Sequence, residues 1–338
     1  MKKFLSVFVF MLLISSLALT GCSSGGKDSS SGSKSDNGNS AAANYPNKPI
    51  KIIVPSSAGG GTDTTTRALV KATKPFLTDN IAVVNKPGGS GAIGMSYVAN
   101  SKPDGYTLCM TFVEMTFLHS EGLANVTYKD FEPIALINSD PGAITVKANS
   151  KWKTAKDLIQ YAKAHPGEVK VGTAGTGSIW DLVAAYIEKK TGVKFKHVPY
   201  KGAAPAVKAL LSGEVDMVTV SPAEVLSQVQ SGKLRMLAVA SDKRSDVLPK
   251  VPTMKEAGIG DIQAGTWRGL VAPKGTPQAI IDKLDKAFVK GAKTDEFQKF
   301  MHNAGLGIKI KHSDEFGQFI KQNVDRWSQT IKDLGLAK

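Results

Sequence analysis

The sequence predicts an α/β protein with two domains joined by a hinge of two crossing strands. Three observations support this fold class. From residue 45 onward, short apolar stretches alternate with amphipathic ones, and turns containing glycine or proline separate them; such alternation is typical of parallel α/β sheets. About 290 residues lie in this region, which is enough for two hydrophobic cores. Extended stretches at 144–148 and 269–272 flank the middle block, where a chain would cross between domains and return.

Each element is predicted from its own pattern. The expected strands cover residues 50–54, 81–85, 106–112, 169–172, 195–199, 215–220 and 234–240. The expected helices cover residues 63–74, 92–99, 179–190, 205–211, 222–230, 277–293 and 313–334. Pro277 suits a helix start, and Ser313 suits the N-cap of the last helix. The apolar residues of that helix recur at helical period and predict one buried stripe: Phe316, Phe319, Ile320, Val324, Trp327, Ile331 and Leu334.

These elements give a division of the chain into four parts. Residues 1–21 are predicted to be a signal peptide, and residues 22–44 a lipidated cysteine followed by a disordered tether. The first domain is discontinuous and comprises residues 45–147 and 266–338. The second domain, residues 148–265, is inserted into it. Two crossing strands between domains make a good hinge.

The N-terminus predicts secretion and anchoring. Two lysines precede an apolar run at residues 4–14, which is long enough for a signal-peptide core but short for a membrane span. Leu19-Thr20-Gly21-Cys22 then resembles the lipobox of bacterial lipoproteins, in which the cysteine is acylated and the chain is cut before it. An ordinary secretory signal with an incidental cysteine is the alternative. The following residues are rich in serine, glycine and asparagine, as in a flexible tether.

Cysteine and charge content limit the function classes. Cys109 lies in an apolar strand and is expected to be a buried thiol without a disulfide partner, since Cys22 would carry lipid. The net charge is +14, from 43 basic and 29 acidic residues. A basic protein can attract anionic ligands or lie near anionic lipid and wall polymer. No nucleic-acid motif is present and the lysines are scattered, so we expect no nucleic-acid partner.

Four turns between a predicted strand and a predicted helix are candidate anion sites. They cover residues 55–63, 172–178, 199–205 and 220–222, and the first two are rich in glycine. Amide groups at a helix start, together with the helix dipole, favour negative charge. In open α/β sheets ligands gather at this edge. Because the first two turns belong to different predicted domains, we expect them to form the two sides of a cleft.

Other chemistries have weaker support. Gly89-Ser90-Gly91-Ala92-Ile93-Gly94 matches the dinucleotide pattern GxGxxG, but we interpret it as a turn packed against a neighbouring element, with nucleotide binding as the alternative. No Walker A motif and no GxSxG nucleophile elbow occurs. The five histidines lack metal-ligand spacing, so no metal and no cofactor are expected. The sequence shows no catalytic constellation, and we expect no enzyme activity.

A series of short motifs runs in order along the chain: YPNKPI at 45–50, AGGGTD at 58–63, NKPGGSG at 85–91, KPDGYTL at 102–108, GTAGTGS at 172–178, VPYKG at 198–202, GEVD at 213–216, VPTM at 251–254 and EAG at 256–258. Together these motifs resemble those of the tripartite tricarboxylate transporter substrate-binding family, also called Bug-type or TctC-type receptors. The resemblance covers nearly everything from residue 45 to the C-terminus. Each motif alone has little specificity, but their number and order are specific.

The resemblance implies a Venus-flytrap fold of the type II periplasmic-binding-protein kind, which closes on a small carboxylate. Loop amides and hydroxyls, rather than an arginine clamp, would hold the carboxylate. The carried-over binding residues are Ser57, Ala58, Gly60, Gly61, Thr62 and Asp63 in the first domain, and Thr173, Gly175, Thr176, Ser178, Tyr200 and Ser221 in the second. We expect Gly60 and Gly175 to need positive φ. This chain departs from the family at Ser56-Ser57, where Phe-Pro is common, and at Asp181, where histidine is common.

The resemblance also implies partners. A small carboxylate, such as a dicarboxylate or tricarboxylate, would be the ligand, and the integral membrane subunits of a tripartite transporter would receive it. The protein would be an extracytoplasmic monomer attached to the bacterial cell membrane by lipid. A receptor of the same fold that serves a sensor kinase is the first alternative. An extracytoplasmic α/β enzyme and a structural surface protein are further alternatives.

Overall fold

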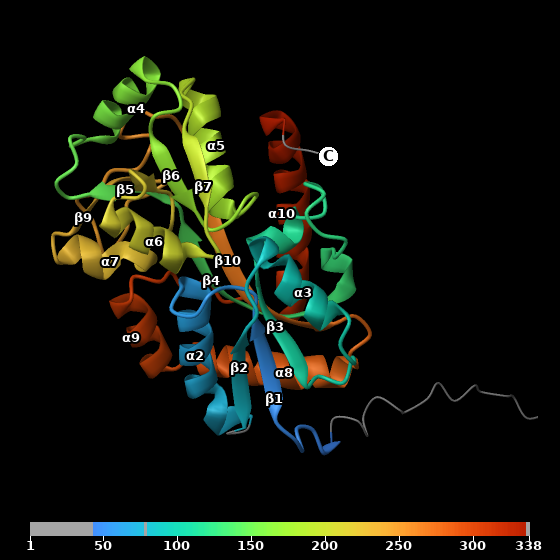
Figure 1. Cartoon of the computed structure of the whole chain (residues 1–338). Coiled ribbons are helices and arrows are strands. Elements are labelled where there is room, and N and C mark those ends of the chain that lie inside the picture. The colour runs from blue at the N-terminus through green and yellow to red at the C-terminus, as the bar shows by residue number, and fades with distance from the viewer. Residues whose placement is uncertain (1–42, 78–79, 336–338) are drawn as a thin grey trace, which may run out of the picture. The chain divides into compact units, whose positions relative to one another are not determined.

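A computed structural model describes residues 43–77 and 80–335 of the chain. The predicted signal peptide, Cys22 and almost all of the predicted tether lie outside these residues. Within them, none of the helices is both long enough and apolar enough to cross a membrane. Two five-stranded sheets with helices around them make up the described part of the chain, so the predicted α/β fold class is confirmed (Figure 1).

The first sheet has the strand order β2-β1-β3-β10-β4. Its strands are β2 (Ile81–Asn85), β1 (Ile50–Val54), β3 (Thr107–Phe112), β10 (Gly265–Pro273) and β4 (Phe131–Pro141). β1 is parallel to both of its neighbours, with Ile52 opposite Val83 and Leu108. β10 is antiparallel to β3 and to β4. The parallel strands β1, β2 and β3 therefore end at one edge, which faces the second sheet in Figure 1.

The second sheet has the strand order β7-β6-β8-β5-β9. Its strands are β7 (Lys196–Pro199), β6 (Lys170–Thr173), β8 (Met217–Val218), β5 (Ala143–Lys147) and β9 (Leu234–Val239). β6 is parallel to β7 and to β8, whereas β5 is antiparallel to β8 and to β9. Three parallel strands again end at one edge, where their turns lead into helices.

The chain passes between the sheets where β4 leads into β5 and where β10 begins. Gly142 separates β4 from β5, and its amide donates to the carbonyl of Ala264, just before β10, at 2.8 Å. The predicted crossing segments lie elsewhere: residues 144–147 are part of β5 in the second sheet, and residues 269–272 are part of β10 in the first. These segments are extended because they pair within a sheet. We propose that the domains divide at Gly142 and Ala264.

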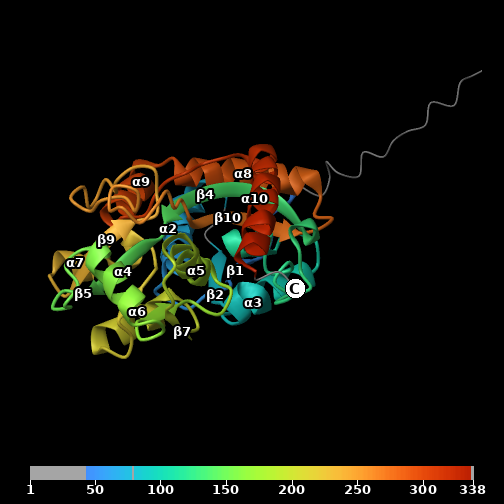
Figure 2. The ribbon, with the colours of Figure 1, turned by 90° about the horizontal axis from the view of Figure 1, so that it is seen from above.

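Helices follow most of the parallel strands and cover the sheets. They are α2 (Gly61–Thr73), α3 (Ala92–Ala99), α4 (Ala155–Ala164), α5 (Ile179–Thr191), α6 (Ala203–Ser212), α7 (Pro222–Gln230), α8 (Gln278–Ala292), α9 (Asp295–Asn303) and α10 (Ser313–Leu334). Short 3-10 turns occur at η1 (Lys74–Phe76), η2 (Gly89–Gly91), η3 (Val113–Thr116) and η4 (Tyr128–Asp130). Both α8 and α10 contact β4, and the view from above shows them along that strand (Figure 2).

The last helix buries the stripe that its sequence predicts. Phe316, Ile320, Trp327 and Ile331 are buried, and the remaining apolar residues of the stripe are partly buried against the same core. Phe316 meets Trp267 of β10 edge to face, with ring centroids 5.4 Å apart. Cys109 of β3 is fully buried with a free thiol, as predicted, and burial raises its pKa above the usual range. This core fixes β10, which carries a charged residue into the site described next.

Candidate functional site

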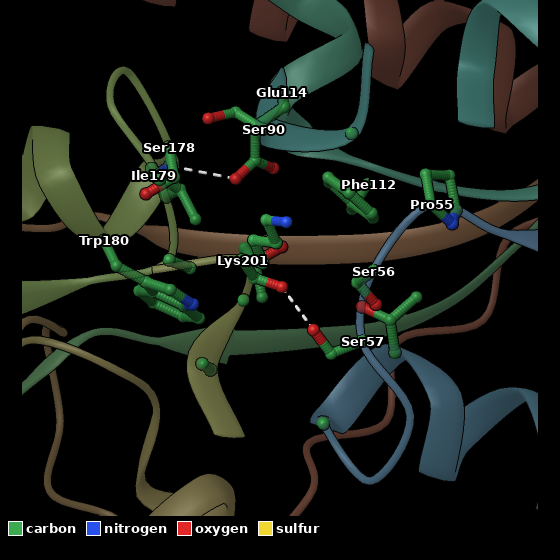
Figure 3. A pocket seen from close by; sticks show the side chains of 18 of the residues that line it. Pro55, Ser56, Ser57, Ser90, Phe112, Glu114, Ser178, Ile179, Trp180 and Lys201 are labelled. Carbon is green, nitrogen blue, oxygen red and sulfur yellow. Dashed lines mark hydrogen bonds between the residues drawn. The ribbon is translucent and has the colours of Figure 1, made fainter. Parts of the chain in front are cut away.

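A cavity of about 330 Å³ lies between the ends of the parallel strands of the two sheets (Figure 3). Of the residues that the sequence predicted to bind a ligand, its lining contains Ser57, Gly60, Gly61, Thr62, Gly175, Thr176, Ser178 and Tyr200. Ala58, Asp63, Thr173 and Ser221 are not in the lining. The two glycine-rich turns therefore border one cavity. Their contact with a ligand remains a prediction.

Asp63 organises the turn after β1. Its carboxylate accepts hydrogen bonds from the Gly59 amide and from Nε of Arg67, both at 2.9 Å. It also accepts one from the side-chain amide of Asn85 at 3.1 Å. Burial alone would raise the pKa of Asp63, but these hydrogen bonds outweigh burial and hold the pKa below its usual range. Asp63 is thus an ionised carboxylate whose hydrogen bonds stabilise the turn. The turn in this conformation places the start of α2, directly after Gly60, at the cavity.

Asp181 has the equivalent position in the turn after β6. Its carboxylate accepts from the Gly177 amide at 2.9 Å, and it lies 2.5 Å from Nδ1 of His197. Burial alone would lower the pKa of His197, but the bonds to Asp181 and Glu188 raise it to about 9. The imidazolium compensates the charge of Asp181, which is not in the cavity lining. Asp181 therefore stabilises this loop from outside the cavity.

The third and fourth turns contribute unequally to the site. Tyr200 lines the cavity, and its hydroxyl donates to Glu214 at 2.7 Å. Ser221 is fully buried as the N-cap of α7, and its amide donates to Oε2 of Glu224 at 3.1 Å. Glu224 rather than Ser221 reaches the cavity lining. The capping box therefore places a carboxylate where the sequence predicted a hydroxyl.

One of the two glycines expected to need a positive φ does so. Gly175 has φ +134°, and a Cβ there would lie 2.7 Å from Oγ of Ser90. Gly60 has φ −80°, and a Cβ would have as its nearest neighbour the Ser57 carbonyl at 3.6 Å. The expectation for Gly60 was therefore wrong. Gly61 is the constrained position in this turn, because a Cβ there would lie 2.6 Å from Nη2 of Arg268.

The GxGxxG segment, interpreted from sequence as a packed turn, also lines the cavity. It contributes Gly89, Ser90 and Gly91 to the lining, together with the preceding Gly88. Its last glycine, Gly94, does pack closely, because a Cβ there would lie 2.8 Å from Pro55. Ser90 donates a hydrogen bond to the carbonyl of Thr176 at 2.6 Å, so this turn touches the turn after β6. The position of the motif directly after β2 was the signal that could have placed it at the site.

Arg268 of β10 lines the cavity and was not predicted. Its side chain is 2% exposed, and its Nε donates to Oγ1 of Thr62 at 2.9 Å. Its Nη1 donates to Asn138 and to Asp140, both on β4. Glu224 lies further away, with Oε1 at 3.9 Å from Nη2. Burial raises the pKa of Glu224 more than Arg268 and the Ser221 amide lower it. A single guanidinium is thus shared between buried acids.

Glu114, in η3 after β3, is the second unpredicted ionisable group of the site. It is 4% exposed, and its Oε1 accepts a hydrogen bond from the amide of Ile179 at 2.9 Å (Figure 3). Its Oε2 is buried without a hydrogen-bond partner. Burial raises the pKa of Glu114 to about 7, although the Ile179 amide and the charge of Arg268 act in the opposite direction. Polar atoms of this kind are rarely left unpaired in native proteins.

Apolar groups form the remaining wall. Phe112, Leu123, Ile179 and Trp180 all line the cavity, with Phe112 and Trp180 on opposite sides in Figure 3. Binding sites for small molecules commonly combine such walls with a few well-placed polar groups. The arrangement suits a small ligand that has an apolar body and at least one polar end.

Hydrogen bonds bridge the two sides of the cavity. Ser57 donates to the carbonyl of Lys201, as Figure 3 shows, and the Gly61 amide donates to Oε1 of Glu224 at 3.4 Å. The Ser90 and Ile179 bonds run between the same two sides. Turns that follow β1, β2 and β3 thus meet turns and helices that follow β6, β7 and β8. No cluster of three or more metal-ligating side chains is present among residues 43–77 and 80–335.

Comparison with known proteins places this geometry in a family. A model described as the tripartite tricarboxylate transporter family receptor matches residues 65–336. The UPF0065 protein in the gbd 5′ region of Cupriavidus necator is 35% identical over 298 residues, which cover 88% of this chain and 90% of the relative.

Solved structures agree with the sequence matches. The periplasmic binding protein BugD is 33% identical with a TM-score of 0.82, covering 87% of this chain and 100% of the other. MatC from Rhodopseudomonas palustris, solved with bound malate, is 26% identical with a TM-score of 0.80, covering 85% and 100%. Rpa4515 from the same organism, solved with adipate, is 26% identical with a TM-score of 0.81, covering 87% and 99%. These similarities extend over both sheets.

Proposed function

Because the chain belongs to the tripartite tricarboxylate transporter receptor family, we propose that it is an extracytoplasmic receptor, anchored by lipid at Cys22, which captures a small carboxylate and delivers it to the integral membrane subunits of a tripartite transporter. The family and its solved neighbours are solute-binding receptors. MatC with malate and Rpa4515 with adipate support a carboxylate as the ligand class.

The observation that carries the proposal is the pairing of two helix starts across one cavity. The N-terminus of α2 borders it at Gly61 and Thr62, and that of α5 borders it at Ser178 and Ile179. Amides at a helix start favour an anion, and each hydrogen bond to a charged group contributes about 1.5–3 kcal/mol. The Gly61 and Ile179 amides already donate to Glu224 and Glu114, so a ligand carboxylate would bind other amides of the two turns, where the helix dipole still favours an anion.

Ligand capture would act through the two crossings near Gly142 and Ala264. A ligand that contacts both sides binds the closed arrangement better than an open one, and this difference in affinity shifts the population toward closure. The hydrogen bonds that already bridge the cavity, from Ser57 and Ser90, would add to that preference.

The proposal is tested by a thermal-shift screen of organic acids followed by calorimetry on the purified protein. The panel contains dicarboxylates, tricarboxylates, amino acids, aromatic acids and uncharged sugars as controls. An acid present at 1,000 times its Kd should raise the free energy of unfolding by about 4 kcal/mol. Stabilisation by at least one carboxylate and by none of the sugars supports the receptor. Binding of sugars alone would exclude a carboxylate receptor.

A separate prediction concerns the anchor at Cys22, which lies outside the described residues. Cys22→Ala should release the protein from the membrane fraction, because the acylated thiol would be the attachment. Cys109→Ala is the matched control, since Cys109 is buried in β3 and should leave the protein in the membrane fraction. Fractionation followed by immunoblotting measures both. A Cys22→Ala protein that stays in the membrane would disprove lipid anchoring at this residue.

A further inference from the structure

Each of the two helix starts that border the cavity already carries a carboxylate of the protein itself. Glu114, from the first-sheet side, accepts from the amide of Ile179 at the start of α5, at 2.9 Å. Glu224, from the second-sheet side, accepts from the amide of Gly61 at the start of α2, at 3.4 Å. Both carboxylates line the cavity. A ligand there meets acceptor oxygens as well as amide donors.

Glu114 has an oxygen that needs a partner from the cavity. Its Oε2 is buried and accepts no hydrogen bond, and the residue as a whole is only 4% exposed. Its immediate surroundings in the lining are apolar, with Phe112 and Ile179 close in Figure 3. A buried acceptor that lacks a donor carries a desolvation cost that a donor group would remove. The missing partner is therefore a hydrogen-bond donor on the ligand.

The charges around the cavity favour a cationic donor. Arg268 is already bound to Asp140 and faces Glu224, so its charge is shared between two acids. Lys201 also lines the cavity, but it is exposed to solvent. The buried group around Arg268 already contains two carboxylates, those of Asp140 and Glu224, for one guanidinium. Glu114 adds a third carboxylate. A second carboxylate on the ligand near Glu114 would meet like charge, whereas an ammonium group would neutralise it.

We propose, resting on the carboxylate-receptor function above, that the ligand is a zwitterionic amino acid whose ammonium group donates to Oε2 of Glu114. The ligand carboxylate then binds at the turns around Gly60 and Thr176, whose residues line the same cavity. The side chain packs against Phe112, Leu123 and Trp180. Glu114 and Glu224 distinguish amino acids from dicarboxylates, because only an amino acid brings the compensating positive charge.

The protonation of Glu114 makes this inference measurable. Burial raises the pKa of Glu114 to about 7. The positive charge of Arg268 lowers this pKa, and the negative charge of Glu224 raises it. An ammonium ligand binds the ionised carboxylate, so its affinity should increase by about tenfold from pH 6 to pH 8, as the empty site loses its proton. If a ligand carboxylate instead accepted a hydrogen bond from protonated Glu114, the affinity would fall as the pH rises, because Glu114 loses that proton. The sign of the slope separates the two arrangements.

The experiment compares matched ligands by calorimetry. Each of L-leucine, L-phenylalanine and L-aspartate is paired with its hydroxy acid analogue, in which a hydroxyl replaces the ammonium group, and succinate and adipate serve as dicarboxylates. At pH 8 we expect at least one amino acid to bind about tenfold or more tightly than its hydroxy acid. Glu114→Gln keeps an acceptor for the Ile179 amide but loses the charge, and should abolish both that preference and the pH slope.

Glu168→Gln is the control, because Glu168 is an exposed residue that contacts Tyr161 of α4 away from the cavity; it should change neither quantity. The pH profile of the unmodified protein gives a second readout if Glu114→Gln does not fold. Hydroxy acids or dicarboxylates that bind as well as every amino acid, or an affinity that falls with pH, would overturn the inference while leaving the carboxylate receptor intact. If no acid binds at all, both the proposed carboxylate-receptor function and this inference fail.

Discussion

Replacing Arg268 with methionine is expected to lower the free energy of unfolding by about 3–5 kcal/mol. The guanidinium is 2% exposed and bonds to Thr62, Asn138 and Asp140. Methionine fills a similar volume but leaves the carboxylate of Asp140, which is 3% exposed, without its counter-charge. Breaking a buried pair from one side is costly because the remaining charge stays in a poorly polar surrounding. Ligand affinity should fall as well, because Arg268 positions Thr62 at the start of α2.

The matched control is Lys274→Met, just after the same strand. Lys274 pairs with Glu132 at 2.8 Å, but its side chain is 65% exposed, so solvent screens the pair and about 0–1 kcal/mol is expected. Urea denaturation followed by circular dichroism measures both variants at the same pH and salt. A loss below about 1 kcal/mol for Arg268→Met would show that Asp140 does not depend on Arg268.

The second large effect is expected at Gly61. In Gly61→Ala the new methyl group would lie 2.6 Å from Nη2 and 3.1 Å from Cζ of Arg268, which is held on several sides. Overpacking of this kind costs about 1–3 kcal/mol. Because Gly61 is the first residue of α2, the shift also moves the amides that border the cavity. We expect affinity for any bound acid to fall tenfold or more.

Gly60→Ala tests the same turn without the clash. Gly60 has φ −80°, and a methyl group there comes no closer than 3.6 Å to the Ser57 carbonyl. Its unfolding free energy should change by less than about 1 kcal/mol, and its affinity should stay near that of the unmodified protein. Urea denaturation and calorimetry on both variants provide the comparison. Equal losses at Gly60 and Gly61 would mean that the turn responds to any side chain, and that Arg268 is not the cause.

Elements with strong local patterns could be predicted from the sequence. The limits of α7 and α10 agree with the predicted ranges 222–230 and 313–334, because Pro222 and Gly335 mark helix ends locally. The predicted N-cap role of Ser313 was wrong: His312 is the N-cap of α10, and the Ser313 hydroxyl donates to the carbonyl of Pro133 at 2.8 Å. The glycine-rich turns at Gly60 and Gly175 were placed at the ends of the correct strands. Short-range chemistry determines these features, so a reading of neighbouring residues is sufficient.

Elements that depend on distant partners could not be predicted. β4 was missed because Pro133, Asn138 and Asp140 interrupt its apolar pattern. Two of these polar residues are buried because Arg268, far along the chain, bonds to them. The same pairing brings Arg268 to the cavity, which no local motif indicates. α4 was also missed, although Thr154 and Asp157 form a capping box at its start.

The site shows the same division between local and distant causes. Glu114 lies about twenty residues after the GxGxxG segment, where a dinucleotide fingerprint would place an acid, and no other sequence signal points to it. Its contact with Ile179 joins the turn after β3 to the start of α5, and only the fold brings them together. Lys201 belongs to the VPYKG motif, and its carbonyl rather than its amine meets Ser57. Side chains that cross between the two sides are the part of this site that a sequence alone does not reveal.

The central claim is that a carboxylate binds between the helix starts of α2 and α5. A crystal structure of the protein grown with the acid of highest affinity from the thermal-shift screen tests it most directly. The account predicts a carboxylate oxygen within hydrogen-bond distance of an amide in residues 60–62 or 174–178, with the ligand enclosed by the cavity that Arg268 and Glu114 line. An acid bound outside this cavity, or one inside it whose carboxylate touches neither turn, would contradict the account.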